Sequence, residues 1–513
     1  MNGAESLVRT LLACGIDTCF ANPGTSEMHF VAALDEVKGM NCVLGLAETV
    51  VTGCADGYAR MAGKPAATLL HCGPGLANGL ANMHNAKRAF SPMVNIVGDH
   101  ALAHRPYDTP LTSDVEGIAR PFSHWVRTSM SAPSVGADAA AAVQAALTPP
   151  GQIATLVLPA DASWSAGGQV GTPLAVPQRQ PTSPDNIQAI ARVLRTRQPA
   201  LLLISGEGLT EAGLLSAQRV AHMTGAALRT PTHVARLPRG AGRLPIDRLP
   251  YGINQALELL KPFQHIILVG AKPPAPFFAY PERPNSLAAP GTQFHVLARP
   301  EQDLVGALRD LADELGAPEA VPIVPSTRQP QLMSGRFEAE KFASTLGVLL
   351  PENCIVAEDA VTSGRPLFEY THNAAPHDWL QLTGGAIGHG FACATGAAIA
   401  SPERQVVCLQ ADGAGMYCLQ ALWTQARHKL NIVNVVFANS VYKILQGELV
   451  AVGATPGPVS SDLFDLGRPT LDWVKLAQGM GVESCSVDTL EQFADVFKSV
   501  CAKPGPFLIE FRI

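Results

Sequence analysis

Two polar residues follow two neighbouring β-rich runs near the end of the sequence. Asp412 and Gly413 come directly after QVVCLQA, and Asn439 follows NIVNVVFA. Carboxyl ends of adjacent parallel strands meet at one edge of a sheet, where open α/β sheets bind ligands. A carboxylate, an amide oxygen and a backbone carbonyl suit Mg²⁺, and the amides of Gly413 and Ala414 would add donors for a phosphate. The alternative is that Asp-Gly and Asn-Ser are ordinary turn dipeptides.

A lone carboxylate, Glu48, lies in the apolar helical run LGLAETVVTGCADGYARMAGKP. A glutamate in such a helix usually pairs with a basic group or reaches solvent. When it is desolvated it can instead share a proton with a ring nitrogen of a bound heterocycle. Both interpretations remain open from the residues alone.

A histidine and a glycine-rich loop follow a third run, TLLHCGPGLANG, which holds His71, Gly73, Gly75 and Gly79. Glycines at this spacing after a strand favour a dinucleotide fold, and thus a nicotinamide-dependent oxidoreductase. Pro74 weakens that hypothesis, and so does the expectation that no helix begins until several residues later. His71 is either an acid–base group or a loop histidine satisfied by its neighbours.

The elements that must position these residues are strands with no polar alternation, which are typical of parallel sheets buried on both faces. Such runs are AATLLH, MVNIVGD, ATLVLP, ALLLISG, HIILVG, CIVAED, QVVCLQ, NIVNVVFA and PFLIEF. Stretches rich in proline, serine and glycine at 159–184 and 318–331 indicate linkers. A chain of 513 residues is also too long for one core. We expect three α/β domains, each a doubly wound parallel sheet, at 1–170, 186–318 and 332–513.

Composition narrows the class of partner. The formal net charge of −6 and a pI near 6.2 argue against nucleic acid and leave small anionic ligands possible. Eleven cysteines without a CxxC pair indicate reduced thiols of a cytoplasmic protein. The N-terminus has helical spacing and no basic n-region, so we expect a first helix and no signal peptide. The uncharged stretch 379–402 is rich in glycine and is expected to form a loop and a packed helix, with no membrane partner.

The pair of turns at Asp412 and Asn439 resembles the signature of thiamine-diphosphate-dependent enzymes, which begins Gly-Asp-Gly and ends Asn-Asn. Ala411 and Ala438 replace the first Gly and the first Asn, and these lost residues mainly shape the turn. The resemblance implies Mg²⁺ bound by Asp412, Asn439 and the main-chain carbonyl of Val441. The cofactor-binding residues that it implies are Glu48, Gly385, Ile387, Asp412, Gly413, Ala414, Asn439, Val441 and Tyr442.

Glu48 is followed by ADGYAR and GKP in the order of the same family, although Ala47 stands where the family often has His. The family glutamate shares a proton with the pyrimidine ring of thiamine diphosphate. By the same resemblance, the Gly385 carbonyl accepts from the 4′-amino group of the cofactor, and Ile387 is the bulky residue that holds the cofactor bent.

Further stretches resemble the benzoylformate decarboxylases of this family. His71 matches an active-site histidine, and Thr25 in ANPGTSEMHF stands where an active-site serine is expected. Pro281 stands where those enzymes have a second histidine, which is a departure from their pattern. The implied catalytic residues are Glu48, His71 and Thr25. The implied substrate contacts are Asn78, Ile444, Leu445 and Glu448.

Glu448 replaces a phenylalanine of the aryl pocket, and Ile444 replaces a small residue. A carboxylate there must meet a polar substrate group, a basic partner or water, or else be protonated. Alternatively, Glu448 turns to solvent on a mobile loop. The first arrangement predicts poor turnover of benzoylformate and a preference for smaller or polar 2-keto acids.

The resemblance therefore implies non-oxidative decarboxylation of a 2-keto acid to an aldehyde. An acetolactate-synthase-like carboligase or C–C lyase is the alternative, and the nicotinamide-dependent oxidoreductase is the distant one. FAD is not expected, because the chain is shorter than the FAD-binding acetolactate synthases and its middle part shows no FAD motif. The family places the cofactor between the first domain of one subunit and the third of another, which implies a homo-oligomer, at least a dimer and most simply a dimer of dimers.

Overall fold

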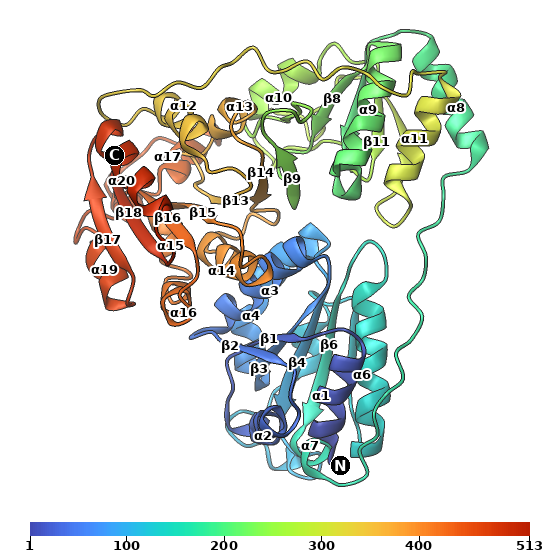
Figure 1. Ribbon diagram of the computed structural model, residues 1–513, viewed down its shortest axis with the longest axis vertical. Coiled ribbons are helices and arrows are strands. Elements are labelled where there is room, and N and C mark those ends of the chain that lie inside the picture. The colour runs from blue at the N-terminus through green and yellow to red at the C-terminus, as the bar shows by residue number, and fades with distance from the viewer.

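A computed structural model describes all 513 residues. Three mostly parallel sheets, each flanked by helices, stack into three α/β domains, which confirms the expected fold class. In Figure 1 the first domain lies at the bottom, the second at the upper right and the third at the upper left. An extended segment along the right-hand edge joins the first to the second, and another along the top joins the second to the third. No helix is both long and apolar enough to cross a membrane.

The first sheet is entirely parallel. Its strands, in spatial order, are β2 (Asn41–Leu44), β1 (Thr18–Ala21), β3 (Ala66–His71), β4 (Met93–Asp99), β6 (Ile153–Pro159) and β5 (Trp125–Thr128). Its helices are α1 (Gly3–Ala13), α2 (Met28–Glu36), α3 (Glu48–Ala62), α4 (Cys72–Ala89), α5 (Val115–Ala119), α6 (Ala132–Leu147) and α7 (Ala160–Trp164), with short 3-10 turns η1 (Thr25–Glu27) and η2 (Arg105–Tyr107).

The second sheet is also parallel and is the smallest. Its strands, in spatial order, are β10 (Asp247–Arg248), β8 (Ala227–Thr230), β7 (Ala200–Ile204), β11 (His265–Val269) and β12 (Gln293–Ala298). Its helices are α8 (Pro184–Arg195), η3 (Gly206–Leu209), α9 (Glu211–Thr224), α10 (Ile253–Leu260) and α11 (Leu304–Glu314).

The third sheet has one antiparallel edge strand that comes from the middle of the chain. Its strands, in spatial order, are β17 (Glu483–Val487), β18 (Phe507–Arg512), β16 (Ile432–Ala438), β15 (Val406–Ala411), β13 (Ile355–Asp359), β14 (His377–Gln381) and β9 (Arg236–Arg239). Its helices are α12 (Ala339–Leu349), α13 (Leu367–Tyr370), α14 (Gly390–Ala400), α15 (Asp412–Gly415), α16 (Ala421–Arg427), α17 (Lys443–Ala451), α18 (Pro458–Phe464), α19 (Trp473–Gly479) and α20 (Leu490–Cys501).

Strand β9 is one of the strands that the sequence did not predict, and it completes the sheet of another domain. Its sequence RLPR is short and charged and contains Pro238, which is tolerated at the edge of a sheet. It pairs with β14 although it belongs to the range 186–318. We propose that the domain borders follow the three expected ranges. In this division, β9 is a segment of the middle range that completes the third sheet.

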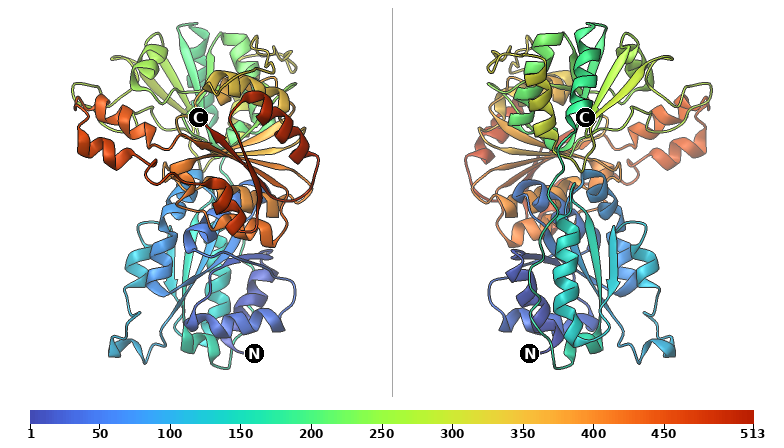
Figure 2. Two further views of the ribbon diagram at one scale, coloured as in Figure 1. Left: turned by 90° about the vertical axis from the view of Figure 1, so that its left-hand side faces the viewer. Right: turned by 90° about the vertical axis from the view of Figure 1, so that its right-hand side faces the viewer.

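The hydrophobic cores cross the domain borders. One core of 38 buried residues joins α3 and α4 of the first domain to α14 and α16 of the third. Another, of 48 buried residues, joins the middle domain to the opposite face of the third sheet. The third domain is therefore packed on both faces against the other two, and Figure 2 shows it between them in the two side views.

Helices α3 and α14 approach each other closely because glycines stand at their contact. A Cβ atom on Gly57 would lie 2.1 Å from the backbone oxygen of Cys393, and one on Gly396 would lie 1.8 Å from that of Cys54. Real Cβ atoms do not approach backbone this closely, so each helix needs glycine where it meets the other.

A buried ion pair lies beside this contact. Arg60 donates to both carboxylate oxygens of Asp56, and His389 Nε2 lies 2.8 Å from the same carboxylate. Arg60 also donates to the backbone oxygens of Gln381 in the third domain and Ala235 in the middle range. One guanidinium thus connects all three parts of the chain.

The α3–α14 contact leads to a stability prediction. Gly57→Ala forces a methyl group against the backbone of Cys393. Overpacking of this kind lowers the free energy of unfolding by about 1–3 kcal/mol. We expect the thermal midpoint to fall by roughly 2–12 °C. The matched control is Gly447→Ala in α17, where a Cβ would meet nothing within 4 Å, and this change should leave the midpoint unchanged or higher. Equal midpoints for the two variants, measured by calorimetry, would contradict the packing argument.

A second prediction concerns pH. Burial lowers the pKa of His389, but Cys393 and the hydrogen bond to Asp56 outweigh it and raise this pKa to about 9. A raised pKa stabilises the folded state fully below the ordinary histidine value of about 6.5, and this stabilisation is lost as pH rises through about 9. The thermal midpoint of the natural protein should therefore fall more steeply between pH 6.5 and 9.5 than that of His389→Gln. Parallel curves would show that His389 is not charged in the folded protein.

Candidate active site

The ends of β15 and β16 place Asp412 and Asn439 at the same edge of the third sheet. The two strands are adjacent and parallel, with Ala411 opposite Phe437. One oxygen of Asp412 accepts from the Gly413 amide at 2.8 Å, and the other accepts from the Ser440 amide at 2.7 Å. The carboxylate thus holds the two turns together.

The donor set at this edge fits a divalent cation. Asp412 is 3% exposed, and its burial raises the pKa of its carboxyl group above the usual value. A cation would relieve that cost. Asn439 Oδ1 accepts from the Val441 amide at 2.9 Å, and the Val441 carbonyl accepts from the Lys443 amide at 2.8 Å. Each of these oxygens keeps a lone pair for a metal ion.

Gly413 and Tyr442 also pack at this edge. A Cβ on Gly413 would lie 2.4 Å from Cε1 of Tyr442, so only glycine fits between the turn and the ring. Ala414 lies in the short helix α15, which begins at Asp412. The expected phosphate donors therefore lie beside the expected metal ligands.

The loop between β14 and α14 holds Gly385 and Ile387. Asn85 of α4 pairs with the backbone of Ala386, donating to its carbonyl at 2.8 Å and accepting from its amide at 3.2 Å. Asn82 donates to the Gly388 carbonyl at 3.2 Å. No hydrogen bond within the chain uses the Gly385 carbonyl, so this acceptor is free for a ligand. Ile387 is half-buried.

Exposed aromatic side chains flank this loop. Phe277 is 45% exposed and its ring would touch a Cβ on Gly385, and Tyr417 is 55% exposed and packs against Gly388. Exposed aromatics gathered around a free backbone acceptor are typical of a binding surface.

Glu48 is the first residue of α3 and is 7% exposed. Asn78 of α4 donates to its Oε2 at 3.2 Å, and no basic side chain forms an ion pair with it. The structure therefore rules out both ordinary explanations of Glu48, a basic partner and free exposure to solvent. Asn78, expected to contact substrate, contacts Glu48 in this chain.

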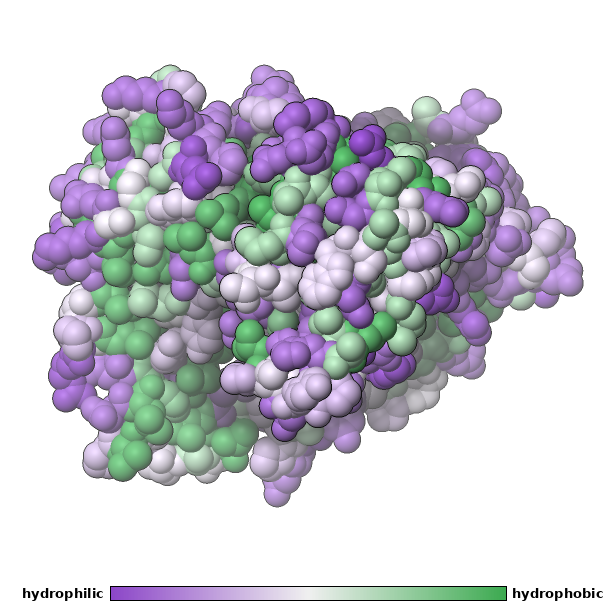
Figure 3. All heavy atoms as spheres, turned by 90° about the horizontal axis from the view of Figure 1, so that it is seen from below, coloured by the Kyte–Doolittle hydropathy of each residue, from purple (hydrophilic) through white to green (hydrophobic).

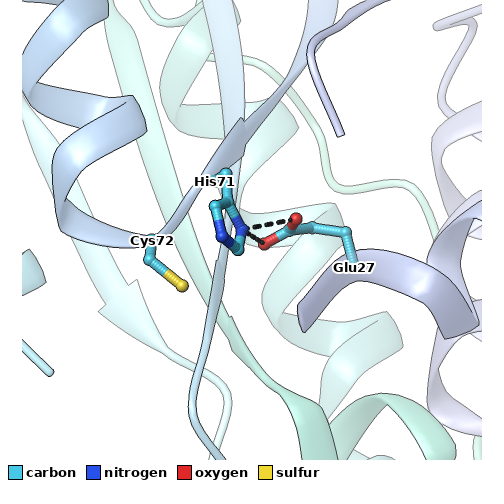
Figure 4. Close-up of side chains that lie close together, drawn as sticks. All are labelled: Glu27, His71 and Cys72. Atoms are coloured by element: carbon cyan, nitrogen blue, oxygen red, sulfur yellow. Dashed lines mark hydrogen bonds and ion pairs between the residues drawn. The ribbon is translucent and has the colours of Figure 1, made fainter. Parts of the chain in front are cut away.

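A second carboxylate, Glu27, lies against His71 (Figure 4). The side chain of Glu27 is completely buried, and its oxygens lie 2.9 and 3.1 Å from His71 Nδ1. The Nε2 atom of His71 has no hydrogen-bond partner in the protein, and the side chain is 21% exposed. An imidazole held at one nitrogen by a buried carboxylate, with the other nitrogen free, can donate and accept protons.

Two glycines, which have no side chain, make room for the Glu27–His71 pair. A Cβ on Gly98 would lie 1.7 Å from Glu27 Oε1, and one on Gly24 would lie 2.2 Å from the His71 ring. Gly98 lies opposite His71 in the β3–β4 register. The sequence interpretation missed Glu27, although it stands three residues after Gly24, the spacing at which a side chain caps a turn.

Thr25, Ser26 and Cys72 surround the pair. Thr25 is exposed and makes no side-chain hydrogen bond, whereas Ser26 Oγ lies 3.2 Å from His71 Nδ1 and also contacts Glu27. A role for Thr25 stays a prediction. Burial, together with Glu27 and Asp99, raises the pKa of Cys72 to about 11, so its thiol stays protonated at neutral pH.

The glycine-rich loop after β3 is part of a helix. Contrary to the sequence expectation, α4 begins directly at Cys72, because the glycines let it pack closely on its neighbours. A Cβ on Gly75 would meet Glu48 Oε1 at 2.8 Å and His71 Cβ at 3.3 Å, and one on Gly73 would meet Ser113. Gly75 thus brings Glu48 and His71 into one site.

Glu448 lies in α17, directly after the proposed metal-binding turn. Its two oxygens accept from the hydroxyl groups of Tyr251 at 3.1 Å and Tyr280 at 2.7 Å. It therefore neither pairs with a basic group nor points freely to solvent. Ile444 lies one helical turn earlier and is half-buried, and Leu445 is 40% exposed.

Two chemical surfaces result. The third sheet presents oxygen ligands and backbone donors for a metal–phosphate group, and the first presents Glu48 beside a carboxylate–imidazole pair. No hydrogen bond or ion pair joins the two surfaces within the chain. The fold and these two surfaces are typical of a cofactor-dependent α/β enzyme.

Comparison with known proteins gives the family. The N-terminal TPP binding domain of thiamine pyrophosphate enzymes matches residues 1–118, and the C-terminal TPP binding domain matches 359–511. The two matched ranges contain the two surfaces described above. The chain belongs to the thiamine pyrophosphate enzymes, and this assignment removes the nicotinamide-dependent alternative.

Relatives within the family carry two kinds of name. A Mycobacterium tuberculosis protein with the provisional name acetolactate synthase large subunit IlvX is 49% identical over 99% of this chain and 98% of its own length. The benzoylformate decarboxylase of Pseudomonas aeruginosa is 27% identical over 97% and 96%. The structure of a thiamine diphosphate-dependent 4-hydroxybenzoylformate decarboxylase from Rhodococcus jostii superposes with a TM-score of 0.87 at 24% identity, covering 100% of this chain and 99% of its own. That structural likeness shows the shared fold.

The metal-binding turn leads to a third prediction. Asp412→Ala should abolish retention of thiamine diphosphate in the presence of Mg²⁺, because the carboxylate that ties the two turns and faces the cation is lost. Titration calorimetry measures this directly. Asp495→Ala, an exposed carboxylate on α20, serves as control and should bind like the natural protein. Unchanged affinity in Asp412→Ala would refute the metal site.

Proposed function

We propose that this protein is a thiamine-diphosphate- and Mg²⁺-dependent enzyme that decarboxylates a 2-keto acid to an aldehyde without oxidation. The observation that carries the proposal is the Glu27–His71 pair, whose free Nε2 lies on the same surface as Glu48. Decarboxylation leaves an electron pair on the former keto carbon, and aldehyde release requires a proton there. We propose that His71 Nε2 supplies this proton.

Other residues of this chain would bind the metal ion and the cofactor. Asp412, Asn439 and the Val441 carbonyl would hold Mg²⁺, with Gly413 and Ala414 as phosphate donors. Glu48 would hold a proton at the pyrimidine ring, and the Gly385 carbonyl would accept a hydrogen bond from the amino group of the cofactor. The chemistry that bound thiamine diphosphate supplies is a carbon nucleophile and an electron sink beside the keto group.

Each half of the site needs the other, so we propose that a second copy of the chain completes it. No hydrogen bond within the chain joins Glu48 to Asp412, although both halves would contact one cofactor. Figure 3, which views the first domain from below, shows hydrophobic residues gathered in one continuous area at the side of this face. An area of this kind suits burial between subunits, and a dimer of dimers is the arrangement we favour.

Carboligation is the second candidate, favoured by the 49% identity to the M. tuberculosis protein with an acetolactate synthase name. The two reactions share every step through loss of CO₂ and then differ in what the carbon receives, a proton or a second carbonyl group. Product analysis with pyruvate separates them, because decarboxylation gives acetaldehyde and carboligation gives acetolactate.

The fourth prediction tests the acid–base pair. His71→Ala should lower aldehyde release by roughly 10²–10⁴-fold, since general acid–base help of this kind is lost, while cofactor affinity changes little. Glu27→Gln should also slow release, because an amide cannot stabilise the imidazolium as a carboxylate does. Single-turnover kinetics and calorimetry provide the two measurements.

Cys72→Ser is the control at the same site, because Cys72 lies beside the pair and takes no part in proton transfer. We expect it to keep at least about a third of the natural turnover. A loss of less than about threefold in His71→Ala would show that His71 is a structural residue.

A further inference from the structure

The two tyrosines on Glu448 come from a different part of the chain than the helix that carries it. Tyr251 precedes α10, and Tyr280 follows β11, both in the middle range, whereas Glu448 belongs to α17 of the third domain. The α17–α18 hairpin projects from the third domain (Figure 2), and none of its residues is buried. The two hydroxyl contacts therefore fix the carboxylate on an otherwise open hairpin.

Contacts place this carboxylate beside the proposed cofactor surface. Helix α17 begins two residues after Val441, and Glu448 lies on the same helical face as Ile444, one turn further along. The ring of Tyr251 lies 5.5 Å from that of Phe277, and Phe277 packs against Gly385. The path from the free Gly385 carbonyl to Glu448 is thus formed by two aromatic rings in contact.

The carboxylate of Glu448 has no basic side chain within ion-pair distance. Glu448 is half-buried and forms no ion pair with any lysine, arginine or histidine. Arg365, which lies 5.5 Å from the centre of the Tyr251 ring, stacks on that ring and does not reach the carboxylate within ion-pair distance. Burial and the carboxylate raise the pKa of Tyr280 to about 12 and also raise that of Tyr251, so both hydroxyl groups remain protonated donors.

We propose that Glu448, held by Tyr251 and Tyr280, selects 2-keto acids whose far end carries a positive charge, an ammonium or a guanidinium group. This proposal rests on the proposed function and adds the substrate class. A cationic group would be attracted both by the carboxylate and by the faces of the Tyr251 and Phe277 rings. A neutral aryl group would leave the carboxylate without a counter-charge, and an anionic end would be repelled.

The test uses the holoenzyme with thiamine diphosphate and Mg²⁺ and three keto acids of similar length. These are 2-keto-5-guanidinopentanoate, its neutral isostere 2-keto-5-ureidopentanoate, and the anionic 2-ketoadipate. We expect kcat/KM for the guanidino acid to exceed that for the ureido acid by at least about tenfold, the size of one charge-assisted contact. The anionic acid should be the poorest substrate.

Glu448→Gln keeps the size of the side chain and removes its charge, so the preference should fall to within about threefold, mainly through a higher KM for the guanidino acid. Tyr280→Phe removes one hydroxyl contact and should give an intermediate preference. Thermal midpoints check that both variants are folded. A preference that survives Glu448→Gln would overturn the assignment to this residue.

Failure of this proposal is distinguishable from failure of the proposed function. Efficient turnover of the ureido or the anionic acid with poor turnover of the guanidino acid would refute the selectivity and leave the decarboxylase proposal intact. If none of the three acids is turned over, calorimetry of the guanidino acid on the holoenzyme decides: binding that weakens at least about tenfold in Glu448→Gln supports the cation site, and equal or absent binding refutes it.

Discussion

The buried ion pair between Asp56 and Arg60 is the interaction on which the arrangement of the three domains depends. Both side chains are excluded from water, at 0% and 1% exposure. Desolvating two charges costs several kcal/mol per ion, so the pair persists only because every charged atom finds a partner. Burial raises the pKa of Asp56, but Arg60 and His389 outweigh it and hold this pKa below its usual value. Since Arg60 also donates to backbone of the third domain and the middle range, separation of the domains would break these hydrogen bonds to the carbonyls of Gln381 and Ala235.

This junction determines the geometry of the loop that carries Gly385. Arg60 binds the Gln381 carbonyl where the loop leaves β14, and His389 binds Asp56 where the loop enters α14. Asn85 then fixes the middle of the loop by pairing with Ala386. The loop is therefore held by helices of the first domain at both ends and at its centre. A backbone acceptor placed on such a loop needs no reorganisation when a ligand binds.

Close approaches permitted by glycine shape the other half of the site in the same way. Glu27 can lie buried against His71 only because Gly98 and Gly24 have no side chain, and Gly75 lies between Glu48 and His71, where a Cβ would meet both. The acidic groups have different partners, since Glu27 has a histidine and Glu48 has only an amide. Glu448 presents a third case, with two phenol hydroxyls and no cation. We thus assign Glu27 to proton transfer, Glu48 to contact with the cofactor and Glu448 to the choice of substrate.

By itself the sequence determined the three parallel sheets, the helices around Glu48 and after 390, and the placement of Asp412 and Asn439 at strand ends. These features depend on local patterns, namely uninterrupted apolar runs and turn residues, which act over a few positions. Tertiary structure alone decided the rest. Strand β9 joins a distant sheet, Glu27 lies against His71, α4 begins at Cys72, and Glu448 meets tyrosines from about 170 and 200 positions earlier in the chain. Such contacts form between residues far apart in the chain, where side-chain volume and unpaired charge select the partner and no local pattern records the choice.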